Sequence, residues 1–571
     1  MSRSRPSDHA EDAATARRPG RERRILIALF VVQALLRAAF TLHHDVDSDE
    51  PQHLHVAWHV ARGDVQYRDV FDNHAPLFHA LSAPLVRAIG ERADILILLR
   101  VALLPLVFVI LWATWRIAGR LHGASSAWWA VALAGLWPDF ILTSSEYRTD
   151  VLWTAFWLLA VMVLVCGRLT RARCAVTGLL LGAALCVSMK STLLLLALGS
   201  AATILVLLRW ARGSRWPFRW MAVRGAVILP GLLLPLLGIA GYFSLRGAGR
   251  VFLYCTITHN MVPGLGTWHK YPNRPWLFLL ALPLVWWLGR SLLDHAPSPG
   301  TGARRALVGL TAAVYLAALY CFWPLITRED FLPFEPLAAV VMAPALLAMS
   351  RRGLGAPGPL ARARRVAPVL LAALEITLVV LKEPPWQDHT QLQTRLLADV
   401  LRLTEPGNYV MDLKGETVFR VRPFYFALEG VTKTRIAAGL IQDSVAQCLV
   451  KTRTCVAVED SRFFPDSARA YMNAHYVSVG RLRVLGHVFA GSGRTPAPPD
   501  TFALSFPERF AVIANHGRGD GTLDGRRYVG PVRLGAGRHS YQPGPGEDTV
   551  AVIWAQAAER NFTPFASTAT P

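Results

Sequence analysis

The chain has 571 residues, of which 53% are hydrophobic and only 17% are charged, so it is not an ordinary soluble globule. The formal net charge of +21 comes almost entirely from arginine, and these arginines fall in short segments between apolar runs. That distribution is typical of membrane topology rather than of a nucleic-acid-binding surface. The seven cysteines form no CxxC pair, which excludes a zinc ribbon or a disulfide-built mini-domain.

The first 24 residues are polar and rich in arginine, so we expect a disordered tail held on the cytoplasmic side of a membrane. The first apolar run follows at residues 25–42. A cleaved signal peptide is the alternative, but no small-residue cleavage site follows this run and the next residues are acidic. An uncleaved membrane anchor is therefore favoured.

Ten further apolar runs have lengths close to that of a bilayer-spanning helix. With the first run, they predict a polytopic α-helical membrane protein with about eleven transmembrane helices within residues 25–382. The arginines fall in alternate loops, which places those loops in the cytoplasm and residues 383–571 on the outer face. The ten runs are 94–115, 124–143, 150–167, 174–190, 191–208, 225–245, 276–289, 306–325, 331–349 and 366–382.

Residues 383–571 have a different character from the rest of the chain. Strand-like runs alternate with Gly, Pro and Asp turns, which predicts an extracytoplasmic soluble domain of mixed α/β or β-rich structure. Its length of roughly 185 residues is enough for a hydrophobic core of its own. Cys448 and Cys455 are its only cysteines. An outer compartment would allow them to pair, so a disulfide and two free thiols are both open.

The segment after the first apolar run holds four carboxylates in six positions, ending with Asp49 and Glu50. Carboxylates at the exit of a membrane helix are costly to hold near lipid, so they indicate function, with a solvated linker as the alternative. Pro51 suits the first turn of a helix, which places both acids at its positive end. An ionised carboxylate there can act as a general base or ligate a hard cation. The candidate ligands of a divalent metal ion are Asp49, Glu50 and His53.

The outer loop 43–93 is longer than a connector needs. Pro76 suits the start of a second helix whose apolar side could lie in the membrane interface. A lid that packs over the helix bundle is the alternative.

Other ionisable residues lie at the ends of the predicted spans. Asp150 opens the fourth span, where it either caps the helix or shares a site with Asp49 on the same face. Lys190 is an isolated cation between two apolar runs, and it is either functional or a snorkelling boundary residue. Arg148 precedes Asp150, and Arg328 opens the polar segment before the tenth run.

These segments resemble the membrane glycosyltransferases of the GT-C superfamily, and within it the branch of protein O-mannosyltransferases and lipid A aminoarabinose transferases. The resemblance covers about residues 25–350. It rests on Asp49-Glu50 after the first span, the glycine-then-tyrosine segment 63–69 leading to His74-x-Pro76-Leu77, Arg148-x-Asp150, Lys190 and the segment 328–336.

The resemblance implies a polyprenyl-phosphate-linked sugar donor, an outward-facing site and transfer to an acceptor with inversion at the anomeric carbon. The acidic positions of the family fall on Asp49, Glu50 and Asp150, with Asp49 as the proton acceptor. Because the phosphate leaving group develops negative charge, nearby cations would stabilise it. The candidates for this role are Lys190, Arg148, Arg328 and His74.

The expected partners are the lipid-linked sugar, membrane lipids and an envelope acceptor, which is a glycolipid, a polysaccharide or a protein hydroxyl. We expect no nucleic acid, and apart from the possible divalent cation no cofactor is implied. The C-terminal domain matches no acceptor-binding module. The composition suits a multi-pass protein of a bacterial inner membrane.

A chain with many apolar helices and carboxylates near the membrane could also have one of two other functions. One is a proton-coupled transporter, but no internal repeat is evident and the ionisable cluster is expected at the outer surface rather than at mid-membrane. The other is a non-catalytic scaffold whose outer domain binds envelope glycans.

Overall fold

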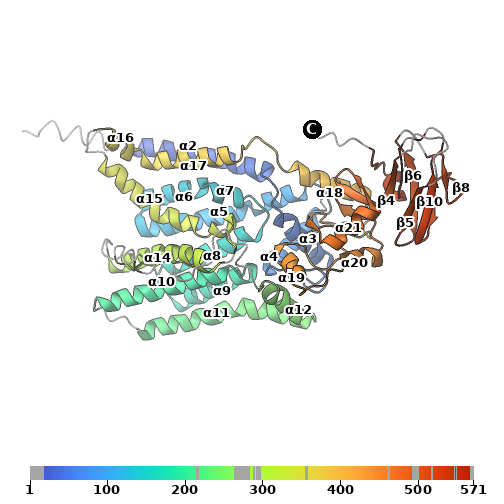
Figure 1. Cartoon of the computed structure of the whole chain (residues 1–571). Coiled ribbons are helices and arrows are strands. Elements are labelled where there is room, and N and C mark those ends of the chain that lie inside the picture. The colour runs from blue at the N-terminus through green and yellow to red at the C-terminus, as the bar shows by residue number, and fades with distance from the viewer. Residues whose placement is uncertain are drawn as a thin grey trace, which may run out of the picture.

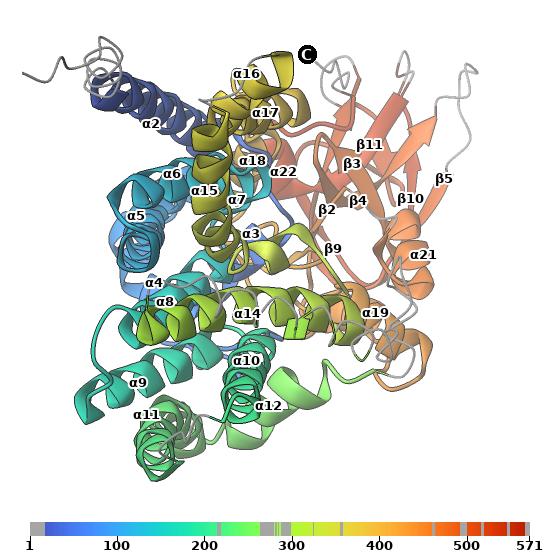
Figure 2. The same ribbon diagram turned by 90° about the vertical axis from the view of Figure 1, so that its left-hand side faces the viewer.

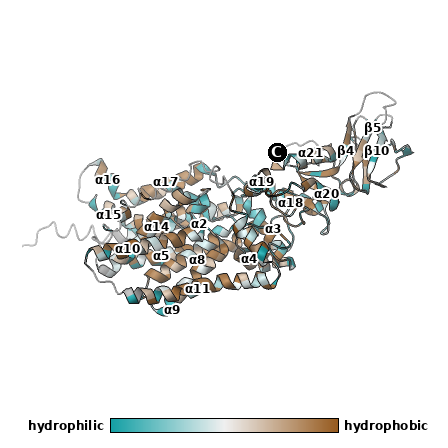
Figure 3. Cartoon of the chain, turned by 60° about the horizontal axis from the view of Figure 1, so that its bottom comes forward, coloured by the Kyte–Doolittle hydropathy of each residue, from teal (hydrophilic) through white to brown (hydrophobic). Residues whose placement is uncertain are grey.

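Long apolar helices lie side by side in an elongated bundle, and the C-terminal domain continues from one end of it, as the computed structural model shows (Figure 1). Apolar colours dominate the bundle, whereas hydrophilic colours gather around α3 (Asp49–Arg62), where the bundle meets this domain (Figure 3). The structure describes residues 18–213, 218–262, 298–323, 325–353, 358–459, 463–490, 500–515, 519–544 and 549–565, with single positions between 279 and 290 and at 547.

The apolar runs within the described residues are helical, because a helix satisfies its own backbone hydrogen bonds where water is absent. The first helix that the structure describes begins at residue 18 rather than 25, so the arginine-rich end of the expected tail belongs to it. The helices that match the runs are α2 (Arg18–His43), α5 (Ile95–His122), α6 (Ala124–Leu136) with α7 (Pro138–Thr143), α8 (Thr149–Val165), α9 (Arg171–Val187), α10 (Ser191–Ala211), α11 (Phe218–Leu245), α14 (Pro299–Phe322), α15 (Glu335–Arg352) and α17 (Ala367–Lys382).

Five helices in the described part of the chain are long and apolar enough to cross a bilayer, which supports a multi-span membrane protein. The total of about eleven spans stays a prediction, and the expected run 276–289 lies largely outside the described residues. The five segments are Gly20–His43, Ile95–His122, Ser191–Ala211, Ala222–Leu245 and Gly300–Phe322.

Basic and acidic segments lie at opposite ends of the bundle (Figure 1). The short helix α16 (Pro359–Arg365) carries three arginines in its last turn and lies at the end far from the C-terminal domain. Helices α3 and α4 (Leu77–Ile89) lie at the other end, beside that domain. This separation agrees with the alternation of arginines along the sequence.

Two glycines of α9 let it pack against α11, beside which it lies in the view along the bundle (Figure 2). A Cβ atom at Gly178 would lie 2.1 Å from the carbonyl oxygen of Ile228, and one at Gly182 would lie 2.3 Å from that of Leu232. Larger side chains would therefore force the two backbones apart. Through α12 (Gly249–Leu253) and the π-helix η1 (Tyr254–Thr258), α11 leads to a segment that borders the candidate site.

The loop after α2 folds into the two helices α3 and α4. Helix α3 begins at Asp49 with Pro51 in its first turn, and it ends before Gly63, whose φ of 99° closes the helix in the left-handed region. Both acids of the predicted pair thus lie in the first turn of α3. Proline and glycine fix the two ends of this helix, which is why its bounds follow from the sequence.

The C-terminal domain contains two sheets. A seven-stranded sheet has the order β1-β2-β4-β11-β6-β9 with β3 also paired to β4, and a four-stranded sheet has the order β5-β10-β7-β8. Strands β1 and β2 pair in parallel. The strands are β1 (Val410–Met411), β2 (Val456–Val458), β3 (Tyr476–Val479), β4 (Leu482–Ala490), β5 (Asp500–Leu504), β6 (Glu508–Ala514), β7 (Thr522–Leu523), β8 (Arg526–Arg527), β9 (Val532–Leu534), β10 (Gly537–Gln542) and β11 (Thr549–Trp554).

Helices cover only the part of this domain that lies nearest the bundle. The domain therefore has an α/β half next to the bundle and an all-β half beyond it, which agrees with the expected mixed α/β or β-rich structure. The helices are α18 (Gln391–Leu403), α19 (Gly430–Ala437), α20 (Val445–Lys451), α21 (Asp466–His475) and α22 (Ala555–Glu559).

The C-terminal domain has its own hydrophobic core, and it also contacts the bundle. Val456, Val484 and Val552 belong to its buried cluster. Phe419 is buried in the cluster of the bundle instead, so the two parts share apolar contacts. Cys448 and Cys455 are both free thiols in this structure, which leaves the disulfide unformed.

Candidate active site

Asp49 lies at the N-terminus of α3, where the helix dipole favours a negative charge. Its carboxylate pairs with two cations from distant parts of the chain. Asp49 Oδ2 lies 3.1 Å from Arg148 Nη2, and Asp49 Oδ1 lies 2.5 Å from Lys414 Nζ. The same lysine donates a hydrogen bond to Ser48 Oγ at 2.9 Å. The C-terminal domain therefore contributes a side chain to the centre of the predicted site.

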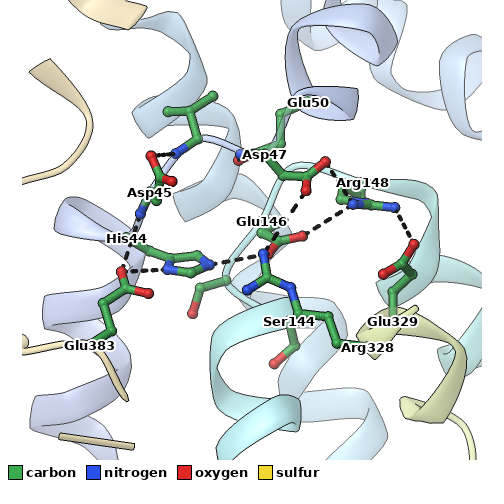
Figure 4. A network of polar contacts seen from close by, with 12 residues as sticks. His44, Asp45, Asp47, Glu50, Ser144, Glu146, Arg148, Arg328, Glu329 and Glu383 are labelled. Carbon is green, nitrogen blue, oxygen red and sulfur yellow. Dashed lines mark hydrogen bonds and ion pairs between the residues drawn. The ribbon is translucent and has the colours of Figure 1, made fainter. Parts of the chain in front are cut away.

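Arg148, at the N-cap of α8, pairs with five carboxylates from three segments, and Figure 4 shows three of them, Asp47, Glu146 at 3.7 Å and Glu329. Besides Asp49, it pairs with Asp47 at 2.7 Å, with Asp150 at 3.2 Å and with Glu329 at 2.8 Å. Only 6% of its side chain is exposed. A guanidinium with five donors in a fixed plane is suited to such a crossing point. Arg148 therefore sets the distances between these carboxylates.

Lys190 lies in the short break between α9 and α10. Its Nζ atom is 2.6 Å from Asp330, 3.6 Å from Glu329 and 3.8 Å from Asp150. Thr327 holds the first of these acids, because its backbone N–H donates to Asp330 Oδ2 at 2.9 Å. With 21% of its side chain exposed, Lys190 presents more of its charge to solvent than Arg148 does.

A second group of ion pairs lies beside the one around Arg148 (Figure 4). Glu146 lies 2.6 Å from Arg328 and 3.1 Å from His44, which in turn lies 2.6 Å from Glu383. Burial raises the pKa of Glu146 to about 7. Burial alone would lower the pKa of His44, but its two carboxylate partners outweigh that effect and raise the pKa to about 8. These ion pairs connect the end of α2 to the start of the C-terminal domain.

His74 lies beside Asp49 in a buried group of polar residues. Its Nδ1 atom is 2.8 Å from Asp72, while His53 Nδ1 lies 3.0 Å from His79 Nε2. Burial opposes the charged imidazolium, but Asp72 and Asp49 outweigh burial and raise the pKa of His74. The imidazole of His74 is therefore protonated more readily than an ordinary histidine.

The two neighbouring acids of the α3 N-terminus differ in acidity. Burial would raise the pKa of Asp49, but the charges of Lys414 and Arg148 outweigh burial and hold that pKa well below its usual range. Burial raises the pKa of Asp47, because Arg148 compensates it only in part. Of these two acids, Asp49 therefore ionises more readily, which agrees with the ionised carboxylate expected at the start of this helix.

A cavity of about 580 Å³ joins most of these side chains. An apolar rim of the cavity is formed by the break before α10, by the end of η1 with the residues that follow it, and by the segment after α14. On that rim, Met189, Ile257, Met261 and Leu325 are exposed. The lining of the polar wall includes Asp49, Gln52, His53, Asn73, His74, Arg148, Asp150, Lys190, Glu329, Lys414 and Glu429.

The structure brings Asp49, Asp150, Lys190, Arg148 and His74 together in this cavity. The other two predicted site residues, Glu50 and Arg328, are not part of the lining.

Glu50 turns to the opposite side of the α3 N-terminus, where it is fully buried. Arg100 of α5 binds both of its oxygens, at 2.5 and 2.8 Å, and the backbone N–H of Tyr147 donates to it at 2.7 Å. This geometry gives Glu50 the role of an anchor between helices.

The three candidate metal ligands do not converge. Glu50 is engaged by Arg100, and His53 is hydrogen-bonded to His79. No group of three or more His, Cys, Asp or Glu in the described part of the chain is arranged to hold a metal ion. The carboxylates at the cavity face arginine and lysine side chains instead, so these residues do not fit a divalent cation.

Several lining residues were not predicted from the sequence. Lys414 and Glu429 come from the C-terminal domain, and Asn260 comes from the segment after η1. One signal was available for Lys414, because it is one of only six lysines in an arginine-rich chain. No local pattern indicates the other two.

No family model matches the sequence, and no curated protein matches it by sequence. Among solved structures, the chain is similar to ArnT from Cupriavidus metallidurans. The apo structure of ArnT has a TM-score of 0.54 at 14% identity, and the structure bound to undecaprenyl phosphate has a TM-score of 0.51 at 13% identity. Each match covers 80% of this chain and 97% of ArnT.

A further match is the archaeal oligosaccharyltransferase AglB from Archaeoglobus fulgidus, in complex with an inhibitory peptide and a dolichol-phosphate. It has a TM-score of 0.44 at 11% identity and covers 79% of this chain and 72% of AglB. The likeness to ArnT shows that the chain shares the fold of that protein over most of its length, in agreement with the resemblance that its motifs carry.

Proposed function

We propose that this protein is a membrane glycosyltransferase that moves a sugar from a polyprenyl-phosphate donor to a hydroxyl group of an envelope acceptor. One observation carries the proposal: an ionised carboxylate, a ring of cations and an exposed apolar rim meet at one cavity at the end of a membrane helix bundle. A site of this composition suits a ligand with a lipid tail, a phosphate and a sugar.

In this proposal the donor lies with its prenyl chain against the exposed apolar rim and its phosphate toward Lys190 and His74. Both side chains line the cavity, and both are partly exposed. Positive charge there stabilises the phosphate as the glycosidic bond breaks. The crystal structure of ArnT bound to undecaprenyl phosphate, which shares this fold, supports a lipid phosphate as the ligand.

The transfer is a single displacement. The acceptor hydroxyl oxygen attacks the anomeric carbon from the face opposite the phosphate, a new C–O bond forms and the bond to the phosphate oxygen breaks. Asp49 accepts the hydroxyl proton, and polyprenyl phosphate leaves with the bonding electrons. The sugar therefore changes its anomeric configuration.

Arg148 has a positioning role in this scheme. Its guanidinium is nearly buried and is surrounded by five carboxylates, so it orients Asp49 and Asp150 rather than exposing free donors to the phosphate. The same proposal places this end of the bundle outside the cytoplasm and the protein in a bacterial inner membrane. The arginine-rich far end of the bundle supports that orientation.

Two measurements test the function. The first compares glycolipids, polysaccharides and secreted proteins by mass spectrometry in cells with and without the gene, which identifies the sugar and the acceptor. The second uses the purified full chain, with undecaprenyl phosphate release as the readout. Asp49→Asn is expected to lose at least about a hundredfold in rate because the proton acceptor is gone. Its matched control, Asp45→Asn, removes an exposed acid four residues away and should keep full activity.

Wild-type rates for a correctly folded Asp49→Asn variant would refute the role of Asp49. An unchanged envelope in the deletion strain, together with solute flux in proteoliposomes, would favour the transporter. Glycan binding by the purified protein without any transfer would favour the scaffold.

A further inference from the structure

Three amide side chains line the cavity of about 580 Å³ as a connected row, which we call the amide row. Gln52 belongs to α3, Asn73 belongs to the loop after it, and Asn260 belongs to the segment after η1. Gln52 Nε2 lies 3.3 Å from Asn73 Oδ1, and Asn73 Nδ2 lies 3.3 Å from Asn260 Oδ1. Three segments that are distant in the chain thus bring neutral polar groups of one kind together.

The amide row leads from the proposed proton acceptor to the apolar rim. At one end, Gln52 follows Asp49 by three residues on α3, and residues at that spacing share a helix face. At the other end, Asn260 Nδ2 lies 3.8 Å from the Sδ atom of Met189, which belongs to the rim. Asn73, in the middle, precedes His74 in the chain. A sugar that is joined to a phosphate near His74 and attacked beside Asp49 is therefore expected along this row.

Hydrogen bonds to the rest of the protein hold the amide row in place. Asn260 Nδ2 donates to the carbonyl oxygen of Asn73 at 2.9 Å and to that of Thr256 at 3.1 Å. Gln52 Nε2 lies 3.4 Å from Asp72 Oδ1, and Asp72 is fully buried. These bonds orient the amides before a ligand arrives, which lowers the entropy cost of binding it.

The oxygen end of Gln52 is available to a ligand. The side chain is only 2% exposed, and its nitrogen faces Asp72 because a carboxylate accepts hydrogen bonds. Its Oε1 atom accepts no hydrogen bond from any residue that the structure describes. A buried acceptor without a donor is costly. A hydroxyl group in the cavity that Gln52 lines would supply that donor.

The charges around the amide row indicate which sugars fit. Asp49, Asp150 and Glu329 all pair with Arg148, and Glu429 accepts hydrogen bonds from two backbone N–H groups of α19. An amino group on the sugar would have to compete with these partners for a carboxylate. A carboxylate on the sugar would compete with the donor phosphate for the same cations. Burying either charge without a partner is costly.

We propose that the amide row binds the sugar of the donor, and that this sugar is a neutral hexose or pentose whose hydroxyl groups exchange hydrogen bonds with Gln52, Asn73 and Asn260. The inference rests on the proposed function, because it names the sugar class for the same site. An amide donates and accepts hydrogen bonds, as a hydroxyl group does, so a row of amides matches successive hydroxyl groups of a sugar ring.

The test measures binding to the purified full chain in lipid nanodiscs. The probes are undecaprenyl phosphate and its derivatives with glucose, galactose and mannose, each sugar in its neutral, 2-amino and uronate form. The affinity of each derivative is divided by that of undecaprenyl phosphate, which isolates the contribution of the sugar. In at least one series, the neutral form should bind about tenfold or more tightly than its two charged forms.

Two variants test the amides themselves. Gln52→Met and Asn260→Leu replace an amide with an apolar side chain of similar size. Each should weaken binding of the preferred neutral derivative by about three- to tenfold, as expected for the loss of a hydrogen bond between uncharged groups. Both should keep the wild-type affinity for undecaprenyl phosphate. The matched control, Gln387→Met, removes an exposed amide before α18 and should change neither affinity.

Equal affinity for the three forms in every series, or tighter binding of a charged form, would overturn the proposal. A folded Gln52→Met protein that binds like Gln387→Met, or that loses undecaprenyl phosphate to the same extent as the sugar derivative, would also overturn it. Undecaprenyl phosphate separates the two proposals. A wild-type protein that binds it without preferring neutral sugars refutes this inference alone, whereas one that binds neither it nor any derivative refutes the proposed donor.

Discussion

Replacing Lys414 with methionine would remove the positive charge that the C-terminal domain places against Asp49, while keeping a side chain of similar length. The pair is close, with 2.5 Å between Nζ and Oδ1, and it is largely buried, with 16% of the lysine and 26% of the aspartate side chain exposed. Together with Arg148, this lysine holds the pKa of Asp49 well below its usual range. We therefore expect the variant to change the pH dependence of transfer.

The direction and size of the change follow from the charges that remain. An opposite charge at this distance lowers a carboxyl pKa by about 1–3 units. Arg148 stays at 3.1 Å and still lowers the pKa of Asp49, so removing the charge of Lys414 should raise that pKa without abolishing its depression. As the pH falls, Asp49 is then protonated, and so lost as a base, at a higher pH than in the wild type. On this acid limb of the pH profile, the activity should fall by about tenfold for each pH unit by which the limb moves, and at a pH well above the limb it should match the wild type.

The measurement is kcat against pH at saturating donor and acceptor, with undecaprenyl phosphate release as the readout. Saturation removes any effect of Lys414 on acceptor binding. Lys414→Arg keeps the charge and should keep the wild-type profile. Lys382→Met removes an exposed lysine of α17 that pairs with Asp139 instead, and it should have no effect. An acid limb at the wild-type pH in a folded Lys414→Met protein would refute this account of Asp49.

Three further predictions concern the bundle and the donor side of the cavity. Lys190→Ala should lower single-turnover phosphate release by about a hundredfold, and a rate within about threefold of the wild type would contradict its role. Glu50→Gln leaves the charge of Arg100 buried without its partner, so it should cost about 3–5 kcal/mol and lower the melting temperature in detergent; an unchanged melting temperature would argue against the anchor role. Gly178→Val should push α11 away from α9 and weaken undecaprenyl phosphate binding, whereas Gly199→Val, which meets open space, should not; equal effects of the two would contradict the close packing.

The helices of the bundle are predictable because each depends on local sequence. An apolar run of sufficient length can satisfy its backbone only as a helix in lipid, and Pro51 and Gly63 fix the two ends of α3. The motif residues at the helix ends are predictable for the same reason, since short connections bring the ends of neighbouring spans to one face. In this way Asp49, Asp150 and Lys190 were expected to lie close together.

The sequence by itself therefore determined the helical bundle, the clustering of its ionisable residues at one end and the sheet-containing domain that follows. Only the tertiary structure decided the direction of individual side chains. Asp49 and Glu50 are adjacent in the chain, yet one faces the cavity and the other binds Arg100, because successive residues of a helix point about 100° apart. The contact between Lys414 and Asp49 spans 365 positions and depends on how the C-terminal domain packs on the bundle, which no local pattern encodes.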